Sequence, residues 1–240
     1  MTPRHRAFEL SPSAAKVELS GDRPSRRLKL LIRQEGVQKR YDRSQKLFRK
    51  GDAASHVVLV EDGIVAITNG LPCGQRQILD FIFSDTMIAP ALSPGEPNHF
   101  TAECLTATTV SVLSLSSVQR ILAVEPELNL AMLDMIFAML DGVYARLSSV
   151  VCSDGTHRIA FLLAYLYEAQ AARTPVGRKE GLPIKQVDLA AAVGISAPHL
   201  NQIIKKLKCQ GLIETNKGKI KVMDIAGLID LAESGSFRSQ

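Results

Sequence analysis

The residues best suited to chemistry lie in one stretch, QVDLAAAVGISAPHLNQIIKKL, from Gln186 to Leu207. Asn201 and Gln202 carry side-chain amides, which can form paired hydrogen bonds with base edges, especially with adenine. Lysines one turn further on can meet backbone phosphates. These residue types therefore favour recognition of duplex DNA. The polar and basic positions are His199, Asn201, Gln202, Lys205, Lys206 and Lys208.

Two short helices must position those side chains. Gly194 fits the tight turn between them, because glycine adopts positive φ at little cost. Ser196 is a good cap for the second helix, and Pro198 is tolerated in its first turn. The inner face of the first helix is predicted to hold Val187, Leu189, Ala190 and Val193. In the second helix, apolar residues recur at i, i+3, i+4 and i+7, namely Leu200, Ile203, Ile204 and Leu207.

The residues that follow predict a β-hairpin with a basic tip. The strands are GLIET and IKVM, and the tip between them is NKGK. A hairpin directly after a recognition helix is a wing, in which lysines would lie near phosphates. The predicted DNA-binding residues are Ser196, Pro198, His199, Asn201, Gln202, Lys205, Lys206, Lys217 and Lys219. The alternative is an ordinary amphipathic helix pair whose polar side simply faces water.

A long helix is predicted over residues 116–153. Its apolar residues are spaced 3, 4, 3, 4 and 3 apart, which is a heptad seam. A second stripe on a neighbouring face holds Leu128, Met132, Met135 and Met139. Two stripes need two partners, and we expect the seam to meet the same helix of a second subunit. The alternative is burial inside a monomer. The predicted dimer interface is Leu133, Ile136, Leu140, Val143, Leu147 and Val150.

Short apolar runs separated by turn residues predict a β-barrel or β-roll over residues 45–115. Asp62-Gly63, between two β-branched runs, predicts a hairpin. The first 27 residues, rich in Ser, Pro and Arg, read as a flexible basic tail. Asp154-Gly155-Thr156 should end the long helix and start a new one, placing a boundary near residue 154. The predicted units are residues 1–27, 28–115, 116–153 and 154–240.

Charge separates these pieces, although the chain as a whole carries a formal net charge of only +5. Residues 1–50 hold 14 Lys/Arg and 5 Asp/Glu, residues 51–153 hold 3 and 11, and residues 154–240 hold 12 and 8. Basic ends suit a polyanion such as nucleic acid, or simply form a solvated surface. With 46% hydrophobic residues, disorder of the whole chain is excluded.

Composition also argues against other classes of protein. The longest apolar run, Ile159–Tyr167, is far too short to cross a membrane, and no secretory signal is present. The four cysteines have no metal-type spacing, which favours a reduced cytoplasmic protein. No nucleophile, paired acid–base set or phosphate loop stands out, so we do not expect an enzyme. We predict no metal site and no cofactor.

The order of these parts resembles the cyclic-AMP receptor protein / fumarate-nitrate reduction regulator (CRP/FNR) superfamily. The resemblance spans residues 28–232 and is strongest in the reader helix, Val193–Gln202. Further matches are Phe48–Asp52, Gly63, Thr101-Ala102 and Asp154–Ala160. It implies an α+β fold: an N-terminal cyclic-nucleotide-binding-type β-roll, a long dimerisation helix and a C-terminal winged helix-turn-helix.

The resemblance further implies a bacterial transcription regulator that binds a near-palindromic site as a homodimer. Its partners would be double-stranded DNA, a second copy of itself and, for an activator, RNA polymerase. Many members have an arginine where this chain has Gln202. Arginine usually reads guanine, so the family's half-site sequence does not carry over.

Departures from the family pattern indicate which effectors the roll could bind. Cyclic-nucleotide binders have an arginine before Ser/Thr-Ala to hold the phosphate, and Phe100 stands there in this chain. Ile88-Ala89-Pro90 lies near the place of the family's Gly-Glu pair. Control by a cyclic nucleotide is therefore not expected. No cysteine precedes Cys73, which argues against the iron–sulfur cluster of the oxygen sensors.

Other signals stay open. Haem could be held only by His56, His99, Cys73 or Cys104 within the roll, and each reads more readily as an ordinary residue. Cys152 and Cys209 could sense redox state if they were exposed and acidic, or could be small buried hydrophobes. An effector would rotate the winged domains about the Asp154–Thr156 hinge. A regulator without an effector would bind its promoter with no additions. The alternative function is a redox- or haem-sensing module that acts through a protein partner.

Overall fold

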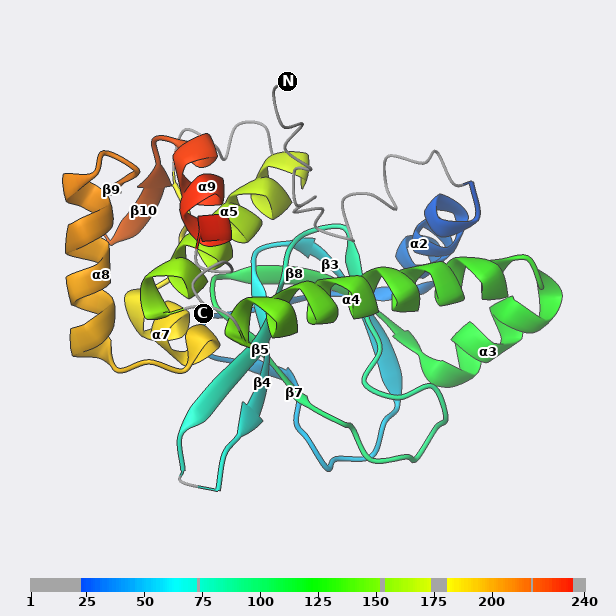
Figure 1. Cartoon of the computed structure of the whole chain (residues 1–240). Helices are drawn as coiled ribbons and strands as arrows, with labels where there is room; N and C mark the ends of the chain where they lie inside the picture. Colours follow the sequence, from blue (N-terminus) through cyan, green and yellow to red (C-terminus); the bar gives the residue numbers. More distant parts are fainter. Residues whose placement is uncertain (1–22, 73, 152–153, 174–180, 217, 235–240) are drawn as a thin grey trace.

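The computed structural model describes residues 23–72, 74–151, 154–173, 181–216 and 218–234. The fold is α+β, with an N-terminal roll, a long helix and a C-terminal helical domain that carries a hairpin (Figure 1). The helices are α2 (Arg23–Glu35), α3 (Leu115–Val124), α4 (Leu128–Val151), α5 (Gly155–Arg173), α7 (Gln186–Val193), α8 (Ala197–Cys209) and α9 (Ile225–Ser234). Among these helices, none is both long and apolar enough to cross a membrane.

The roll consists of two four-stranded antiparallel sheets. One sheet has the order β1-β8-β3-β6, and the other has the order β2-β7-β4-β5. The strands are β1 (Val37–Tyr41), β2 (Lys46–Phe48), β3 (His56–Asp62), β4 (Val65–Gly70), β5 (Arg76–Ile82), β6 (Thr86–Ile88), β7 (Thr101–Cys104) and β8 (Thr108–Ser114). Each sheet closes one side of a shared apolar core. This arrangement confirms the predicted β-roll.

The hairpin predicted at Asp62-Gly63 is wrong. β3 pairs with β6 and β8, whereas β4 pairs with β5 and β7, so this turn carries the chain from one sheet to the other. Gly63 is needed there because its φ is +99° and an added Cβ would lie 2.6 Å from the carbonyl oxygen of Ala107. A local turn pattern specifies a reversal, but strand pairing depends on contacts distant in the sequence.

β3 is buried on both faces. Val58 and Val60 point into the core between the two sheets, while Val57 and Leu59 contact the helices outside. This explains why the strand is a continuous apolar run rather than an alternating one. The roll is therefore a layered structure, with α2, α3 and the start of α4 covering the outer side of one sheet.

The predicted tail over residues 1–27 is wrong at its end, because α2 begins at Arg23; residues 1–22 lie outside the described part. Leu28, Leu31 and Ile32 bury one face of α2 against the roll.

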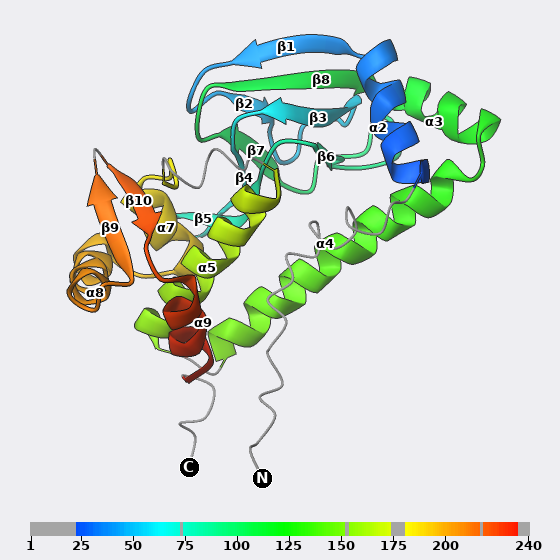
Figure 2. The same ribbon diagram turned by 90° about the horizontal axis from the view of Figure 1, so that it is seen from above.

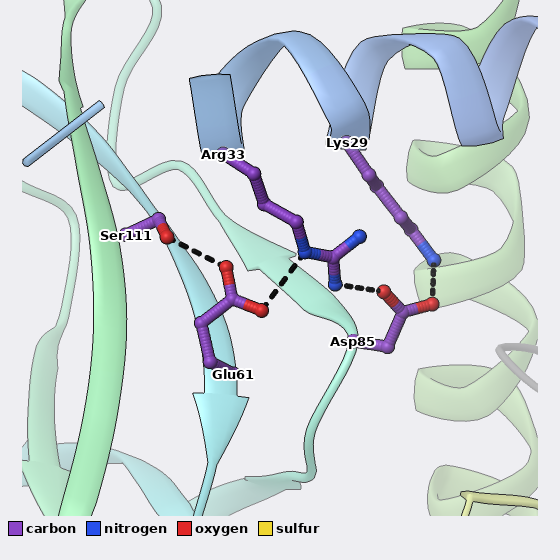
Figure 3. A network of polar contacts seen from close by, with 5 residues as sticks. All are labelled: Lys29, Arg33, Glu61, Asp85 and Ser111. Atoms are coloured by element: carbon purple, nitrogen blue, oxygen red, sulfur yellow. Dashed lines mark hydrogen bonds and ion pairs between the residues drawn. The ribbon is translucent and has the colours of Figure 1, made fainter. Parts of the chain in front are cut away.

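A polar network fastens the same helix (Figure 3). Lys29 and Arg33 both contact Asp85. Arg33 also pairs with Glu61, at 2.9 Å, and Glu61 accepts a hydrogen bond from Ser111.

The single helix predicted over residues 116–153 is two helices. α3 ends at Val124 and α4 starts at Leu128. Pro126 lies between them, and proline disfavours helical backbone in the residue before it. A new helix starts at Gly155, as the sequence predicted. Seen from above, α4 runs from the roll towards α5 and α9 (Figure 2).

The C-terminal domain packs against the second sheet of the roll. α7 lies on β5, and Ile78 and Phe81 of that strand share one apolar cluster with Leu163 and Leu189. In both views α7 lies between the roll and α8 (Figures 1 and 2). The C-terminal domain thus contacts the roll directly, in addition to its connection through α4.

Candidate nucleic-acid interface

The turn between α7 and α8 has the geometry that a helix-turn-helix requires. Gly194 ends α7 in the left-handed region, with φ 68° and ψ 40°. Its amide and that of Ile195 both donate to the carbonyl of Ala190. Ser196 caps α8 by accepting a hydrogen bond from the His199 amide, at 3.4 Å. The local sequence therefore sets the angle at which α8 leaves α7.

α8 has one buried face and one exposed face. Leu200, Ile203, Ile204 and Leu207 are between 0% and 4% exposed, which fastens the helix to its domain. The exposed side contains all the sequence-predicted side chains on this helix and its cap: Ser196, Pro198, His199, Asn201, Gln202, Lys205 and Lys206. Figure 1 shows α8 at the outer edge of the molecule, with one side away from the roll. Such a surface is open to a duplex.

His199 also has a neighbour within the chain. A Cβ added to Gly155 would lie 3.2 Å from the His199 ring, so the ring packs against the first turn of α5. Asp154 caps that turn, because its Oδ1 accepts from the amides of Thr156 and His157 at 2.8 and 3.1 Å. Burial would raise the pKa of Asp154, but these hydrogen bonds outweigh it and lower the pKa. The start of the reader helix thus adjoins the predicted hinge.

The predicted hairpin is present. β9 (Ile213–Asn216) and β10 (Lys219–Val222) pair antiparallel, and Gly218 in the turn has φ 78°. Lys219 begins β10 and is half-buried, whereas Lys217 lies outside the described residues. Lys208 of α8 donates to the Thr215 hydroxyl at 3.0 Å. This contact holds the hairpin beside the exposed side of α8.

Two positions in α7 differ from the sequence prediction. Val187, expected on the inner face, is 59% exposed, and Asp188 is buried instead. Asp188 forms ion pairs with Arg76 at 2.9 Å and with Arg43 at 3.2 Å, both in the roll. Arg76 also pairs with Glu103. The sequence prediction considered only packing within the helix pair, so it missed burial of α7 by the roll. The available signal was Asp188 itself, a charged residue among apolar ones.

The predicted dimer seam lies on the exposed side of α4. Leu133, Ile136, Leu140, Val143 and Leu147 are between 36% and 60% exposed. The side chain of Val150 lies outside the described residues. The residues of the second stripe differ in burial: Leu128 and Met132 are buried against the roll, whereas Met139 is 49% exposed. An apolar face of this length on a helix leaves a surface that needs a partner.

The roll positions at which a ligand was considered lie in different surroundings. Phe100 packs on Phe48, with ring centroids 5.7 Å apart, and His56 meets the same ring edge-on. His99 is exposed. Cys104 is buried, and burial raises the pKa of its thiol. Among the described residues, no group of three His, Cys, Asp or Glu could hold a metal ion.

Of the two cysteines predicted as redox sensors, Cys209 lies in the described part of the chain. Cys209 is a free, exposed cysteine at the end of α8. Cys152 lies outside the described residues, as does Cys73. Lys206 and Lys208 in the last turn of α8 flank the Cys209 position in sequence.

Two family models match the chain. A model described as a cyclic nucleotide-binding domain matches residues 38–125, and one described as a Crp-like helix-turn-helix domain matches residues 157–231. The nitrogen fixation regulation protein FixK of Rhizobium meliloti is 24% identical over 207 residues, covering 86% of this chain and 89% of its own. The transcriptional activator protein FnrA of Stutzerimonas stutzeri is 20% identical, covering 79% and 78%.

Solved structures share the fold. FixK2 from Bradyrhizobium japonicum superposes with a TM-score of 0.72 at 18% identity, over 82% of this chain and 96% of its own. A CRP-family transcriptional regulator from Thermus thermophilus superposes with a TM-score of 0.66 at 20% identity, over 84% and 100%. The likeness includes the roll, the long helix and the C-terminal domain.

Proposed function

The chain belongs to the CRP/FNR family of bacterial transcription regulators and carries its helix-turn-helix DNA-binding domain, and from this we propose that it binds a near-palindromic DNA site as a homodimer. Its relatives are transcription regulators, so it is a regulator and not an enzyme. The observation that carries the proposal is the two-sided character of α8: an apolar face anchored in the domain and a polar, basic face left open.

Base recognition is assigned to the first half of α8. Asn201 and Gln202 read base edges in the major groove, where amides suit adenine. Ser196, Pro198 and His199 lie at the helix start, which approaches the groove in this type of motif. Phosphate contacts come from Lys205 and Lys206 and, on the hairpin, from Lys217 and Lys219.

The second copy is assigned to the exposed seam of α4. Leu133, Ile136, Leu140, Val143 and Leu147 expose apolar surface at heptad spacing, which favours pairing with the same helix of a second subunit. Val150 continues the same spacing. Family members act as dimers, and two reader helices related by a two-fold axis would enter successive major grooves about one helical turn apart. The near-palindromic site follows from that symmetry.

Control by a cyclic nucleotide is not part of the proposal. The resemblance would require a cation before Thr101-Ala102, and the phenyl ring of Phe100 stands there, packed on Phe48. An aromatic ring cannot form the charge-assisted hydrogen bonds that hold a phosphate. Two modes of control are then open. The protein binds DNA without an effector, or a change at the Asp154–Thr156 hinge controls its binding.

The proposed ligand, DNA, also indicates the compartment in which the protein acts. A regulator of bacterial transcription meets DNA in the cytoplasm, and an activator would also contact RNA polymerase. A module that signals only through a protein partner is not favoured, because the relatives are transcription regulators. The units proposed for these roles are the roll (28–115), the dimer helix (within 116–153) and the winged helix (154–240).

The proposal predicts which side chains read the sequence. The purified chain should enrich a two-fold-symmetric sequence from a random DNA pool. Replacing Asn201 and Gln202 with Ala should weaken binding to that sequence by roughly ten- to a hundredfold and relax the preference at the bases they read. Lys206→Ala should weaken binding to all sequences about equally, because it loses a phosphate contact.

Quantitative binding to matched and mismatched duplexes separates these effects. The variant of Asn201 and Gln202 is the test, and Glu214→Gln in the hairpin is a control of similar exposure. A pool that yields no common sequence, or a double variant with unchanged base preference, would contradict the proposed readout.

A further inference from the structure

Two ion pairs connect β5, the outermost strand of its sheet, to helices outside the roll. At the start of the strand, Arg76 pairs with Asp188 of α7 at 2.9 Å. Further along the strand, Asp80 pairs with Arg146 of α4 at 2.8 Å. We call these two ion pairs the β5 joint. The strand therefore contacts both the first helix of the helix-turn-helix and the helix that carries the predicted dimer seam.

Both ion pairs of the β5 joint are shielded from water. Asp188 is 3% exposed, and the side chains of Asp80 and Arg146 are 15% and 19% exposed. Ile78 and Phe81 of the same strand are buried in the apolar cluster that includes the C-terminal domain. Ion pairs with little access to solvent resist separation, because parting them leaves charges poorly solvated. The joint therefore holds its elements more firmly than a surface ion pair does.

The reader helix follows α7, because the helices of the C-terminal domain contact one another closely. Arg158 of α5 donates a hydrogen bond to the Val193 carbonyl at the end of α7, at 2.9 Å. The first turn of α5 lies against α8, since a Cβ on Gly155 would be 3.2 Å from the His199 ring and 3.3 Å from Ile203. Once α7 is fixed on β5, the position of α8 relative to the roll is fixed as well.

The β5 joint also fixes the C-terminal domain relative to the predicted dimer axis. Arg146 is adjacent in sequence to Leu147 of the seam, and its guanidinium lies over the ring of Tyr165 in α5, at 5.5 Å from the ring centre. Arg146 therefore contacts the roll and the C-terminal domain from the dimer helix itself. In a two-fold dimer built on the α4 seam, these contacts determine how far each reader helix lies from the axis.

We propose that the β5 joint determines the spacing between half-sites that the dimer accepts. The inference rests on the proposed function and deepens it, since it needs a homodimer on a two-fold site. Two reader helices held at one separation fit half-sites about one helical turn apart. One added base pair shifts a half-site by about 3.4 Å along the duplex and turns it by about 35°. A dimer with rigidly held reader helices cannot follow both changes.

The arrangement held by the joint leaves the reader helix open, which favours it as the DNA-binding arrangement over an inhibited one. α7 rather than α8 lies on β5. Figure 1 shows α8 at the outer edge of the molecule, with one side away from the roll. Loosening the joint gives the C-terminal domain more orientations, and selecting one of them on DNA costs affinity.

The test changes the number of base pairs between two copies of the selected half-site. The full-length protein is titrated with the selected spacing and with spacings one or two base pairs longer or shorter. The wild type should bind the selected spacing at least about thirtyfold more tightly than any shifted one. The duplexes are the same for wild type and variants, so the cost of deforming the DNA cancels in the comparison.

Arg76→Gln should reduce this preference to about threefold and weaken binding at the selected spacing by about three- to tenfold. Arg43 still pairs with Asp188 in this variant, so the domain is loosened rather than released. Asp80→Asn removes the charge of the other ion pair and should broaden the accepted spacings in the same way. Arg76→Lys keeps a cation beside Asp188 and should retain a preference of about tenfold.

A duplex with a single half-site separates positioning from a general loss of structure. Arg76→Gln and Asp80→Asn should bind it like the wild type, within about twofold, because both substitutions leave α8 and the hairpin intact. Sedimentation and thermal unfolding show whether each variant is a folded dimer at the temperature of the titration.

The matched control is Arg120→Gln. Arg120 of α3 pairs with Glu35 of α2 at 2.7 Å, so this substitution also removes an ion pair, but one outside the C-terminal domain and the dimer helix. It should leave the preferred spacing and the affinity unchanged.

Four results would overturn the inference. The wild type could tolerate shifted half-sites, or both joint variants could keep the wild-type preference. The variants could lose affinity for the single half-site to the same extent as for the full site. They could also bind the selected spacing more tightly than the wild type, which would make the joint an inhibitory contact. Failure to select any two-fold sequence from a random pool overturns the proposed function itself, which distinguishes it from a failure of the joint alone.

Discussion

Asp85 shows how a single carboxylate can fasten one element to another. It lies before β6, and its side chain contacts both Lys29 and Arg33 of α2. Burial would raise its pKa, but the hydrogen bonds from these two cations outweigh burial and lower the pKa below the ordinary 3.8. A lowered pKa in the folded state means that this contribution to stability is complete above about pH 3.8 and is lost as pH falls through the lower, folded value.

Asp85→Asn should therefore destabilise the protein at neutral pH but not in acid. The expected loss in free energy of unfolding is about 1–2 kcal/mol near pH 7, because the pair is partly solvated. The backbone of Asp85 has φ 61°, which asparagine tolerates, so the effect reports the charge. Urea unfolding at pH 7, 5 and 3 measures the difference.

The control for this substitution is Asp52→Asn, an exposed aspartate outside the α2 network. It should be neutral at all three pH values. An Asp85→Asn variant whose deficit stays constant down to pH 3 would show that the lost interaction is not the charge of Asp85.

At the scale of elements, α4 has two different neighbours along its length. Its start is held by the roll through Leu128 and Met132, while the seam further along is exposed. The helix therefore extends an apolar surface beyond the domain that anchors it. Because an exposed apolar row costs free energy in water, the proposed pairing with a second copy would stabilise the protein by covering this row.

Leu140→Glu should convert the protein from dimer to monomer. Two glutamates facing each other across a heptad seam would be buried without partners, so the dissociation constant should rise by at least a hundredfold. Analytical ultracentrifugation measures the change in mass. Binding to a symmetric site should weaken in parallel, since one monomer contacts only one half-site.

Asp141→Ala is the matched control for the seam, because position 141 is adjacent in sequence but turned away from the heptad row. It should leave the dimer intact. A Leu140→Glu variant that stays dimeric would place the subunit interface elsewhere on the molecule.

At the scale of the whole molecule, the roll and the winged helix share an apolar cluster and two ion pairs, both formed by Asp188. Asp188 of α7 is 3% exposed and is held between Arg43 and Arg76 of the roll. A buried carboxylate left without its cations is costly, which couples the position of α7 to that of the roll. Because the Gly194 turn joins α7 to α8, the position of the reader helix is coupled to the roll as well.

Asp188→Asn and Arg76→Gln should show non-additive effects on stability. Each should destabilise by about 1–3 kcal/mol, and the double variant should cost less than their sum by about 1–2 kcal/mol, because the two groups share one interaction. Thermal unfolding followed by separate probes in the roll and in the winged helix measures both the stability and the coupling between the domains.

Asp230→Asn on α9, an exposed aspartate of the same domain, is the control and should change stability little. Strictly additive effects of Asp188→Asn and Arg76→Gln would show that the ionic contact does not couple the domains.

Several features of the fold could be predicted from local sequence. The helix-turn-helix depends on Gly194, the Ser196 cap and the apolar period of α8, and each acts within a few residues. The β9–β10 hairpin and the start of α5 are equally local. The heptad spacing of α4 predicted which face would be apolar, because helical periodicity places those residues on one side whatever surrounds them.

Other features were decided only by tertiary structure. The turn at Asp62-Gly63 reverses the chain as its sequence indicates, but distant strands determine that it connects two sheets. Asp188 is buried because the roll covers α7, and the two arginines that pair with it, Arg43 and Arg76, lie more than 100 residues away in the sequence. Local sequence specifies backbone geometry and the polarity of each face. Which faces meet depends on the packing of elements far apart along the chain, and no local pattern encodes it.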